Sequence, residues 1–141
     1  MKAITITQPN ASLLAIGAIT EISSTRYTAY RGPVAVFAAS SFPMLEQMKL
    51  RNSTFRPALA EHYADEDLDV GNLPTGQIVG VGKLEDCVVN NPLPHWVDDP
   101  KESYLWRFSN MRLLAEPIAC QCERGLTDLP ERIAERLEVF A

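Results

Sequence analysis

Residues 2–17, KAITITQPNASLLAIG, indicate the fold of the first part of the chain, because a strand pattern passes directly into the pattern of a buried helix. Ile4 and Ile6 alternate with polar residues, which predicts a strand. Pro9 then lies in the first turn of a predicted short helix, and Gly17 ends that helix. Because the helix is apolar on almost every side, we expect it to be buried on more than one face.

Downstream of this helix, apolar patterns predict further strands separated by irregular loops. Residues 33–39, PVAVFAA, are apolar on both faces, as in a central strand that is covered on each side. Residues 77–89 predict a long strand in which Gly80 and Gly82 face the same side, where a neighbouring element can approach closely. The other expected segments are a strand over 2–7, an irregular stretch over 20–31, a loop over 90–101, strands over 104–114 and 118–122, and an amphipathic helix over 130–140.

Residues 42–73 interrupt the strands with a predicted helical insertion. Met44, Leu45 and Met48 share one face of its first helix, and a second helix is expected over 56–67. The length of 141 residues favours a single domain over 1–141 that includes this insertion. Strands separated by loops, with helices at the start, middle and end, predict an α+β fold in which helices cap a curled sheet or barrel.

The charge balance argues against a protein that wraps nucleic acid through a strongly basic surface. The chain has 13 basic and 18 acidic residues, a net charge of −5. Five of the acids lie between Glu61 and Asp69, a stretch without Lys or Arg. Without these five, acids and bases are equal in number, so a local basic cleft is compatible with the composition. The acidic stretch itself is typical of a solvated helix end or loop.

The remaining composition predicts a cytoplasmic protein with no metal and no cofactor. No apolar run approaches the ~20 residues that span a bilayer, so no membrane partner is expected. The three cysteines, an odd number, are interpreted as reduced thiols. Cys120 and Cys122, even together with Cys87 and His95, lack the spacing of a structural zinc site.

Several short motifs occur in order along the chain. Gln8-Pro9 precedes the first helix, and Tyr30-Arg31-Gly32-Pro33 follows the irregular stretch. The later motifs are Leu73-Pro74-Thr75-Gly76, Gly80-Val81, Asp86-Cys87, Tyr104, Trp106, Asn110-Met111-Arg112 and Gly125-Leu126-Thr127-Asp128-Leu129-Pro130. This order resembles the ASCH (activating signal cointegrator homology) domain family. The resemblance implies a PUA-like mixed β pseudo-barrel with a cleft beside the first helix, and a role in binding RNA or DNA or in processing modified nucleosides.

The sequence departs from the family pattern at positions that bear on chemistry. Asn10 stands where the family usually has a Trp that could stack on a base. Ile19 replaces the usual Lys, and Ile22-Ser23-Ser24 stands where Glu-Thr-Arg is usual. Lys83 occupies a position at which relatives often have Glu. The family members that hydrolyse amides are similar in having a Lys/Thr/Glu arrangement. Because the Lys and the Glu are missing here from their usual positions, we expect this chain to lack that chemistry.

We therefore predict recognition without catalysis, with RNA, single-stranded DNA or a modified nucleoside as the ligand. Arg31 ranks first, because a guanidinium next to a glycine suits a phosphate. The alternative for Arg31 is that it ties down its own turn through backbone carbonyls, and the alternative for Gln8 is that it caps its own helix. The predicted ligand-binding residues are Arg31, Tyr30, Gln8, Arg26 and Trp106.

Two other functions remain open at this stage. A hydrolase of acylated nucleosides, or a ribonuclease, would use the same cleft, with Thr20 or Ser23 supplying a hydroxyl and Glu21 the base. A protein-interaction adaptor would instead bind its partner through the acids from Glu61 to Asp69.

Overall fold

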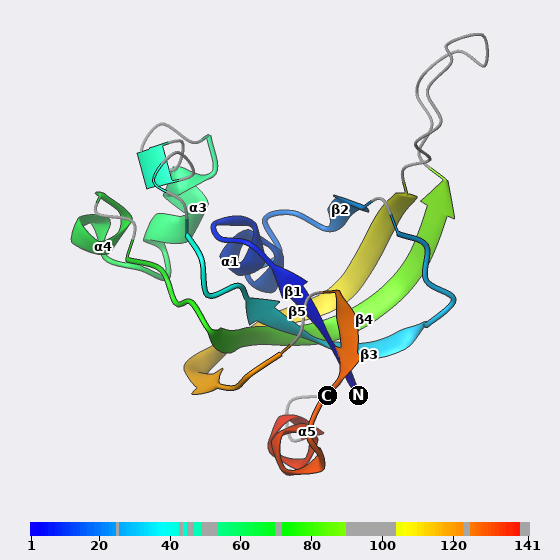
Figure 1. Cartoon of the computed structure of the whole chain (residues 1–141). Helices are drawn as coiled ribbons and strands as arrows, with labels where there is room; N and C mark the ends of the chain where they lie inside the picture. Colours follow the sequence, from blue (N-terminus) through cyan, green and yellow to red (C-terminus); the bar gives the residue numbers. More distant parts are fainter. Residues whose placement is uncertain are drawn as a thin grey trace, which may run out of the picture.

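The structure, a computed structural model, describes residues 1–24, 26–42, 44, 47–48, 54–69, 72–89, 104–122 and 125–138. A strongly curled sheet forms its centre, with one helix in the hollow of the curl and another beneath it (Figure 1). The elements are β1 (Lys2–Ile6), α1 (Asn10–Ala15), β2 (Glu21–Ser24), β3 (Gly32–Ala38), α3 (Arg56–Ala60), α4 (Asp65–Asp69), β4 (Gln77–Val89), β5 (Tyr104–Ala119), β6 (Leu126–Asp128) and α5 (Glu131–Glu138).

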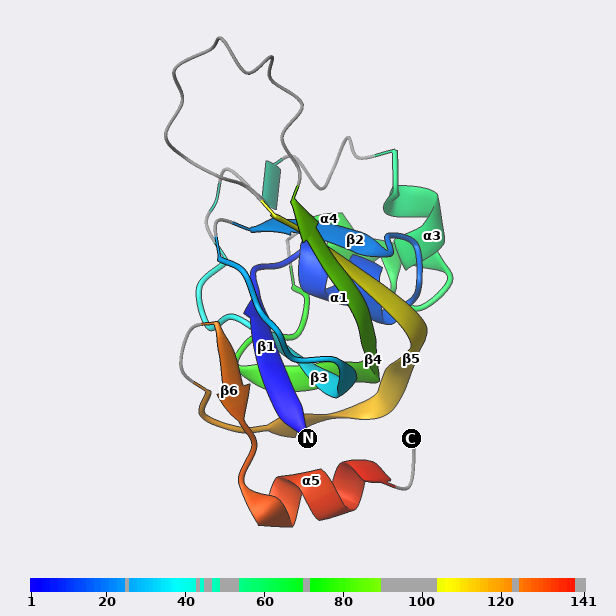
Figure 2. The same cartoon turned by 90° about the vertical axis from the view of Figure 1, so that its right-hand side faces the viewer.

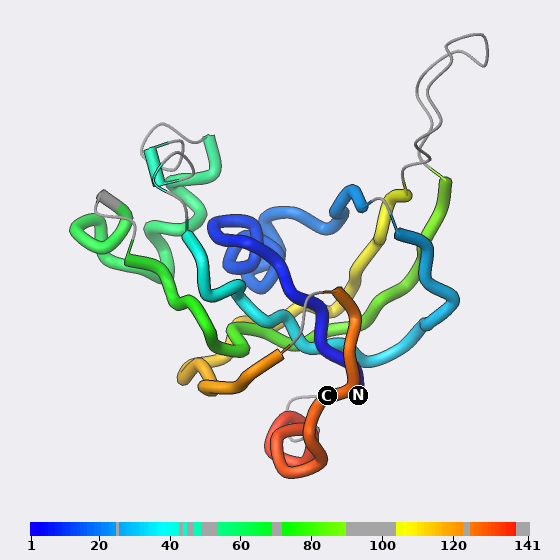
Figure 3. Tube along the Cα trace, viewed as in Figure 1, coloured from blue at the N-terminus to red at the C-terminus, as the bar shows by residue number. Residues whose placement is uncertain are grey.

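The sheet has six strands in the order β2-β5-β4-β3-β1-β6. β1 and β3 are parallel, whereas the other neighbouring strands are antiparallel. The long strands β4 and β5 bend together through most of the curl, as the Cα trace shows (Figure 3). Register shifts interrupt the pairing of β4 with both neighbours, and such irregularities increase the local bend. The predicted curled α+β sheet is confirmed.

Both faces of the sheet are covered, because successive residues of a strand point to opposite sides. On β3, Val34 and Val36 join the core around α1, whereas Ala35 and Phe37 join the core between the sheet and α5. Figure 2 shows α5 below the sheet, on the side away from α1. The apolar run of β3 is therefore that of a central strand, as predicted.

α1 is buried in the hollow of the sheet. All five residues from Ala11 to Ala15 are buried, and the helix contacts β3, β4 and β5. Gly80 of β4 permits this contact, because a Cβ built there would lie 2.6 Å from the Cβ of Ala15. A Cβ on Gly82 would meet the side chain of Met111 on β5. The close approach predicted for both glycines is confirmed.

The inserted segment packs a separate small core against the outer side of α1. Leu13 of α1 meets Leu59, Leu68 and Leu73 there. Instead of one helix over 56–67, the structure has two short helices, α3 and α4, which a turn over 61–64 separates. The predicted face of Met44, Leu45 and Met48 lies only partly within the described residues, and there Met44 and Met48 are exposed.

The strands differ from the sequence-based expectations at three places. β5 is one strand rather than two, and β2 lies within the stretch that was expected to be irregular. β6 was not predicted, and the loop expected over 90–101 lies outside the described residues. α5 agrees with the predicted amphipathic helix, since Ile133 and Leu137 are buried. Among the described residues, no helix is long and apolar enough to cross a membrane.

Candidate functional site

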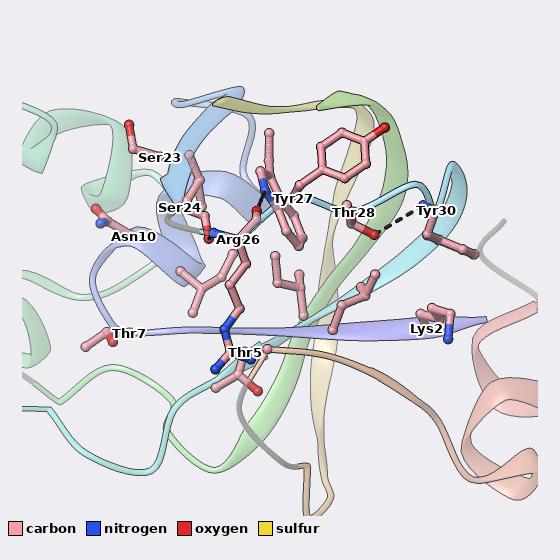
Figure 4. Close-up of a pocket in the computed structure, with 16 residues that line it drawn as sticks. Lys2, Thr5, Thr7, Asn10, Ser23, Ser24, Arg26, Tyr27, Thr28 and Tyr30 are labelled. Carbon is pink, nitrogen blue, oxygen red and sulfur yellow. Dashed lines mark hydrogen bonds between the residues drawn. The ribbon is translucent and has the colours of Figure 1, made fainter. Parts of the chain in front are cut away.

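An open cleft of about 580 Å³ lies between β1, the start of α1, β2 and the segment that leads into β3. Its floor is apolar, and polar side chains surround its rim (Figure 4). The lining residues are Lys2, Ile4, Thr5, Ile6, Thr7, Asn10, Ile22, Ser23, Ser24, Arg26, Tyr27, Thr28, Tyr30, Trp106, Gly125 and Leu126. A volume of this size is typical of a small-molecule or cofactor pocket, and it can hold one nucleotide.

Trp106 of β5 forms part of the floor of the cleft. Its side chain is only 4% exposed, and its indole Nε1 donates a hydrogen bond to the backbone carbonyl of Arg26 at 2.9 Å. The hydroxyl oxygen of Ser24 accepts a hydrogen bond from the backbone N–H of Arg26 at 3.1 Å. The backbone of Arg26 is thus held from both sides, and this positions its side chain at the rim.

Among the described residues that line the cleft, Arg26 is the cation without an ionic partner. Its guanidinium extends over the cleft toward β1 (Figure 4), and Nη1 lies 3.6 Å from the place where a Cβ on Gly125 would be. Gly125 has a φ of 86°, a conformation that favours glycine. Within the described part of the chain, no carboxylate pairs with Arg26.

Lys2 also borders the cleft, but its charge is compensated. Its ammonium group lies 2.8 Å from the carboxylate of Asp128 and 5.7 Å from the centre of the Tyr30 ring. The hydrogen bond and charge of Lys2 lower the pKa of the Asp128 carboxyl. We therefore assign Lys2 to the local structure around β1 and β6 rather than to anion binding.

Two tyrosines face the cleft in different ways. The Tyr30 hydroxyl donates to the backbone carbonyl of Pro33, and its backbone N–H donates to the Thr28 hydroxyl at 3.1 Å. Tyr27 is 58% exposed, and its ring packs against that of Tyr104 with centroids 5.5 Å apart. Tyr27 therefore presents a supported aromatic surface at the rim. Tyr27 was not among the residues predicted from the sequence, although an aromatic residue next to Arg26 in a polar stretch is a recognisable signal.

Gln8 and Arg31, two of the predicted ligand-binding residues, do not line the cleft. Gln8 is 1% exposed, and its side-chain oxygen Oε1 accepts a hydrogen bond from the Ser12 N–H at 3.0 Å. Its amide nitrogen Nε2 donates to the Ser12 hydroxyl and to the Pro74 carbonyl, both at 2.8 Å. It fastens α1 to the segment before β4, because the whole amide is used there. Arg26, Tyr30 and Trp106 do line the cleft.

The Arg31 side chain holds its own turn through hydrogen bonds to backbone carbonyls and does not face the cleft. Its guanidinium donates to the backbone carbonyls of Thr28 at 2.9 Å and Tyr30 at 2.8 Å. It also lies 3.5 Å from the carboxylate of Asp86 and 3.5 Å from the carbonyl of Cys87. These contacts correspond to the alternative that Arg31 ties down its own turn. Arg26 therefore replaces Arg31 as the candidate hydrogen-bond donor to a bound anion.

The residues considered for hydrolysis are not assembled at one place. Ser23 lines the cleft, whereas Thr20 and Glu21 do not. The carboxylate of Glu21 lies 3.2 Å from Nε of Arg107 on β5. Among the described lining residues there is no Asp, Glu or His to serve as a general base.

The acidic stretch and the cysteines lie away from the cleft. Asp65 pairs with Arg56 at 3.8 Å, and the carboxylate of Asp67 accepts a hydrogen bond from Asn72 at 3.0 Å. Within the described ranges, no group of three or more metal-binding side chains occurs.

Lys83 forms an ion pair with Glu85 at 3.7 Å. A hydrogen bond from Ser109, together with the charge of Lys83, lowers the pKa of the Glu85 carboxyl.

Comparison with known proteins identifies the architecture. No family model and no curated protein matches the sequence. Crystal structures of ASCH from Zymomonas mobilis, the unmodified protein and two single-residue variants, superpose with TM-scores of 0.58–0.59. Their sequence identity is 11–12%, and the match covers 98% of this chain and 93–96% of those chains. The chain has the ASCH fold. The resemblance seen in the sequence motifs is therefore matched by the same α+β fold over 98% of the chain.

Proposed function

We propose that the cleft binds one unpaired nucleotide of RNA or single-stranded DNA. The observation that carries this proposal is the position of the exposed Arg26 guanidinium next to the exposed Tyr27 ring at a cleft of nucleotide size, with no carboxylate of the described residues paired to Arg26. The resemblance to the ASCH family, with its roles in RNA or DNA binding, supports the same ligand class.

The chemistry of the lining suits the parts of a nucleotide. A guanidinium binds phosphate oxygens in a bidentate manner, and a tyrosine face stacks on a base of any sequence. Hydroxyl and amide groups of Ser23, Thr28 and Asn10 offer donors and acceptors for the sugar and the base edges. The described lining contains no carboxylate that would repel a phosphate.

The overall charge sets the expected mode of binding. A net charge of −5 does not favour long-range attraction of nucleic acid, so contacts are expected to be few and local. We therefore expect a short segment of single strand to bind in preference to a duplex, because stacking on Tyr27 requires an unpaired base.

Fluorescence anisotropy with short labelled RNA and DNA oligonucleotides tests this proposal at low salt. Replacement of Arg26 by Ala should weaken binding and reduce the steepness of the salt dependence by about 0.7, the value for one phosphate contact on a single strand. Replacement of Tyr27 by Ala should cost about 1–3 kcal/mol, the range for one stacked base.

The matched control is Arg136→Ala, which removes an exposed arginine from α5, on the other side of the sheet. It should leave both the affinity and the salt dependence unchanged. No binding of the unmodified protein at low salt, or equal losses in the Arg26 and Arg136 variants, would contradict the proposal. Competition by a free nucleoside that depends on Tyr27 but not on Arg26 would identify a nucleoside, rather than a strand, as the ligand.

A further inference from the structure

Cys120 and Cys122 form a pair of free thiols just after the end of β5. Their sulfur atoms lie 3.7 Å apart, and both side chains are half-buried. The pair packs against the core between the sheet and α5, away from the candidate nucleotide cleft. Residues 120–122 belong to no strand, so the backbone there is not held in the sheet pairing. The sulfurs need to approach by roughly 1.7 Å to reach the S–S bond length of ~2.05 Å.

Two surface hollows give small molecules access to this pair. One, of about 470 Å³, is lined by both cysteines together with Phe37, Ser40 and Gln121. The other, of about 550 Å³, borders Cys120 but not Cys122. Cys120 is thus reached from both hollows, and this makes it the better placed of the two to meet an incoming molecule. Cys87, in contrast, is buried in the core around α1.

We propose that Cys120 and Cys122 are a site of reversible thiol–disulfide exchange with low-molecular-weight disulfides such as glutathione disulfide. The Cys120 thiolate attacks one sulfur of glutathione disulfide, the S–S bond breaks, and one glutathione leaves as a thiolate that takes up a proton. Cys122 then loses its proton to solvent and attacks the sulfur of Cys120, and this releases the second glutathione. The two protein thiols lose two electrons and two protons, and the disulfide gains them as two glutathione thiols.

The order of the two steps follows from the environments of the sulfurs. Burial, and the hydrogen bond with Cys120, raise the pKa of the Cys122 thiol to about 12. Only a thiolate attacks a disulfide, so Cys122 is the poorer first nucleophile and acts in the second step. Chelation of a metal requires both sulfurs as thiolates, and the described residues provide no third ligand. Exchange, in which one thiolate at a time reacts, is therefore favoured over metal binding.

Mass spectrometry after incubation with glutathione disulfide and alkylation of the remaining thiols tests this proposal. The unmodified protein should lose two hydrogen atoms and leave one alkylatable thiol, Cys87. Trypsin cleavage after Arg112 and Arg124 places both reacting cysteines in the peptide 113–124, and Cys87 in another. Dithiothreitol should restore all three thiols.

Single variants assign the two roles. Cys122→Ala should trap a glutathione adduct on Cys120, whereas Cys120→Ala should gain an adduct on Cys122 more slowly, because burial still raises the pKa of the Cys122 thiol. Cys87→Ala, the matched control, should form the internal disulfide at the rate of the unmodified protein. Adducts on both cysteines without an internal bond, disulfides between chains, or equal rates for the Cys120 and Cys122 variants would overturn the proposal. Circular dichroism of each variant confirms that it is folded.

Discussion

Replacement of Gly80 by Ala tests how closely α1 is packed into the curl of the sheet. A Cβ at this position would lie 2.6 Å from the Cβ of Ala15, and 2.9 Å from the carbonyl oxygen of Arg112 on β5. Because ordinary contact begins near 3.4 Å, α1 has to retreat by about 0.8 Å. The backbone of α1 is close as well, with the Cα of Ala15 at 3.2 Å, so a side-chain rotation cannot relieve the contact.

Two opposing effects set the size of the loss in stability. Overpacking of a filled core costs about 1–3 kcal/mol. Replacing Gly by Ala also lowers the conformational entropy of the unfolded chain, and this stabilises the folded state by about 0.4–1 kcal/mol, which offsets part of the overpacking cost. The contact meets backbone on both sides, so overpacking is expected to prevail by about 1–2 kcal/mol. For a chain of 141 residues this corresponds to a decrease in Tm of roughly 3–8 °C.

Urea unfolding, followed by circular dichroism, measures this loss. A second replacement, Ala15→Gly, removes the atom that the new Cβ meets, so Gly80→Ala should cost less in that background. The interaction free energy from the double-mutant cycle should be about 0.5–3 kcal/mol, the range for residues in contact. A Gly80→Ala protein at least as stable as the unmodified chain would refute the packing argument, as would an unchanged cost in the Ala15→Gly background.

Two further predictions concern polar contacts of Gln8 and Lys2. Gln8→Leu leaves the Pro74 carbonyl and the Ser12 N–H without their buried partner, so the free energy of unfolding should fall by about 2–4 kcal/mol in urea titrations. Lys2→Met should raise the pKa of the Asp128 carboxyl toward its usual value, as followed by NMR titration. Because the pKa of Asp128 in the folded state is lowered, the pair stabilises the fold above the usual aspartate pKa, and this contribution is lost as the pH falls through the lowered pKa. The stability of the Lys2→Met protein should accordingly depend less on pH in that acidic range.

The parts of the fold that sequence reasoning predicted are those with strong apolar patterns. β3 and β4 were recognisable because buried central strands leave long apolar runs, and the glycines of β4 indicated the close contact with α1. The two strands expected over 104–114 and 118–122 form one strand, β5, although Pro117 between them has no N–H to donate to a sheet. The pairing of β5 with β4 shifts between Leu113, opposite Gly80, and Ile118, opposite Ile78, so Pro117 lies in a bulged part of the ladder and the strand continues through it.

The candidate site was harder to predict because its residues depend on side-chain direction. Arg31 and Arg26 are both arginines in one polar stretch. Only the folded chain shows that the Arg31 guanidinium donates its hydrogen bonds to backbone carbonyls. β2, only four residues long, supplies one wall of the cleft but carries too little apolar pattern to be recognised. Tyr27 was missed because its support, the Tyr104 ring, comes from a strand far along the chain.

The margins of the sheet offer little template for the addition of another chain. Its outer strands, β2 and β6, have four and three residues. Beyond Arg107 the outer side of β5 has no strand partner in the described residues, but Asn110 with a φ of 53° disturbs its backbone and Pro117 lacks an N–H donor. Short or interrupted rows of backbone donors and acceptors protect sheet proteins from edge-to-edge aggregation. We expect this protection to keep the chain dispersed at high concentration, even though the sheet does not close into a complete barrel.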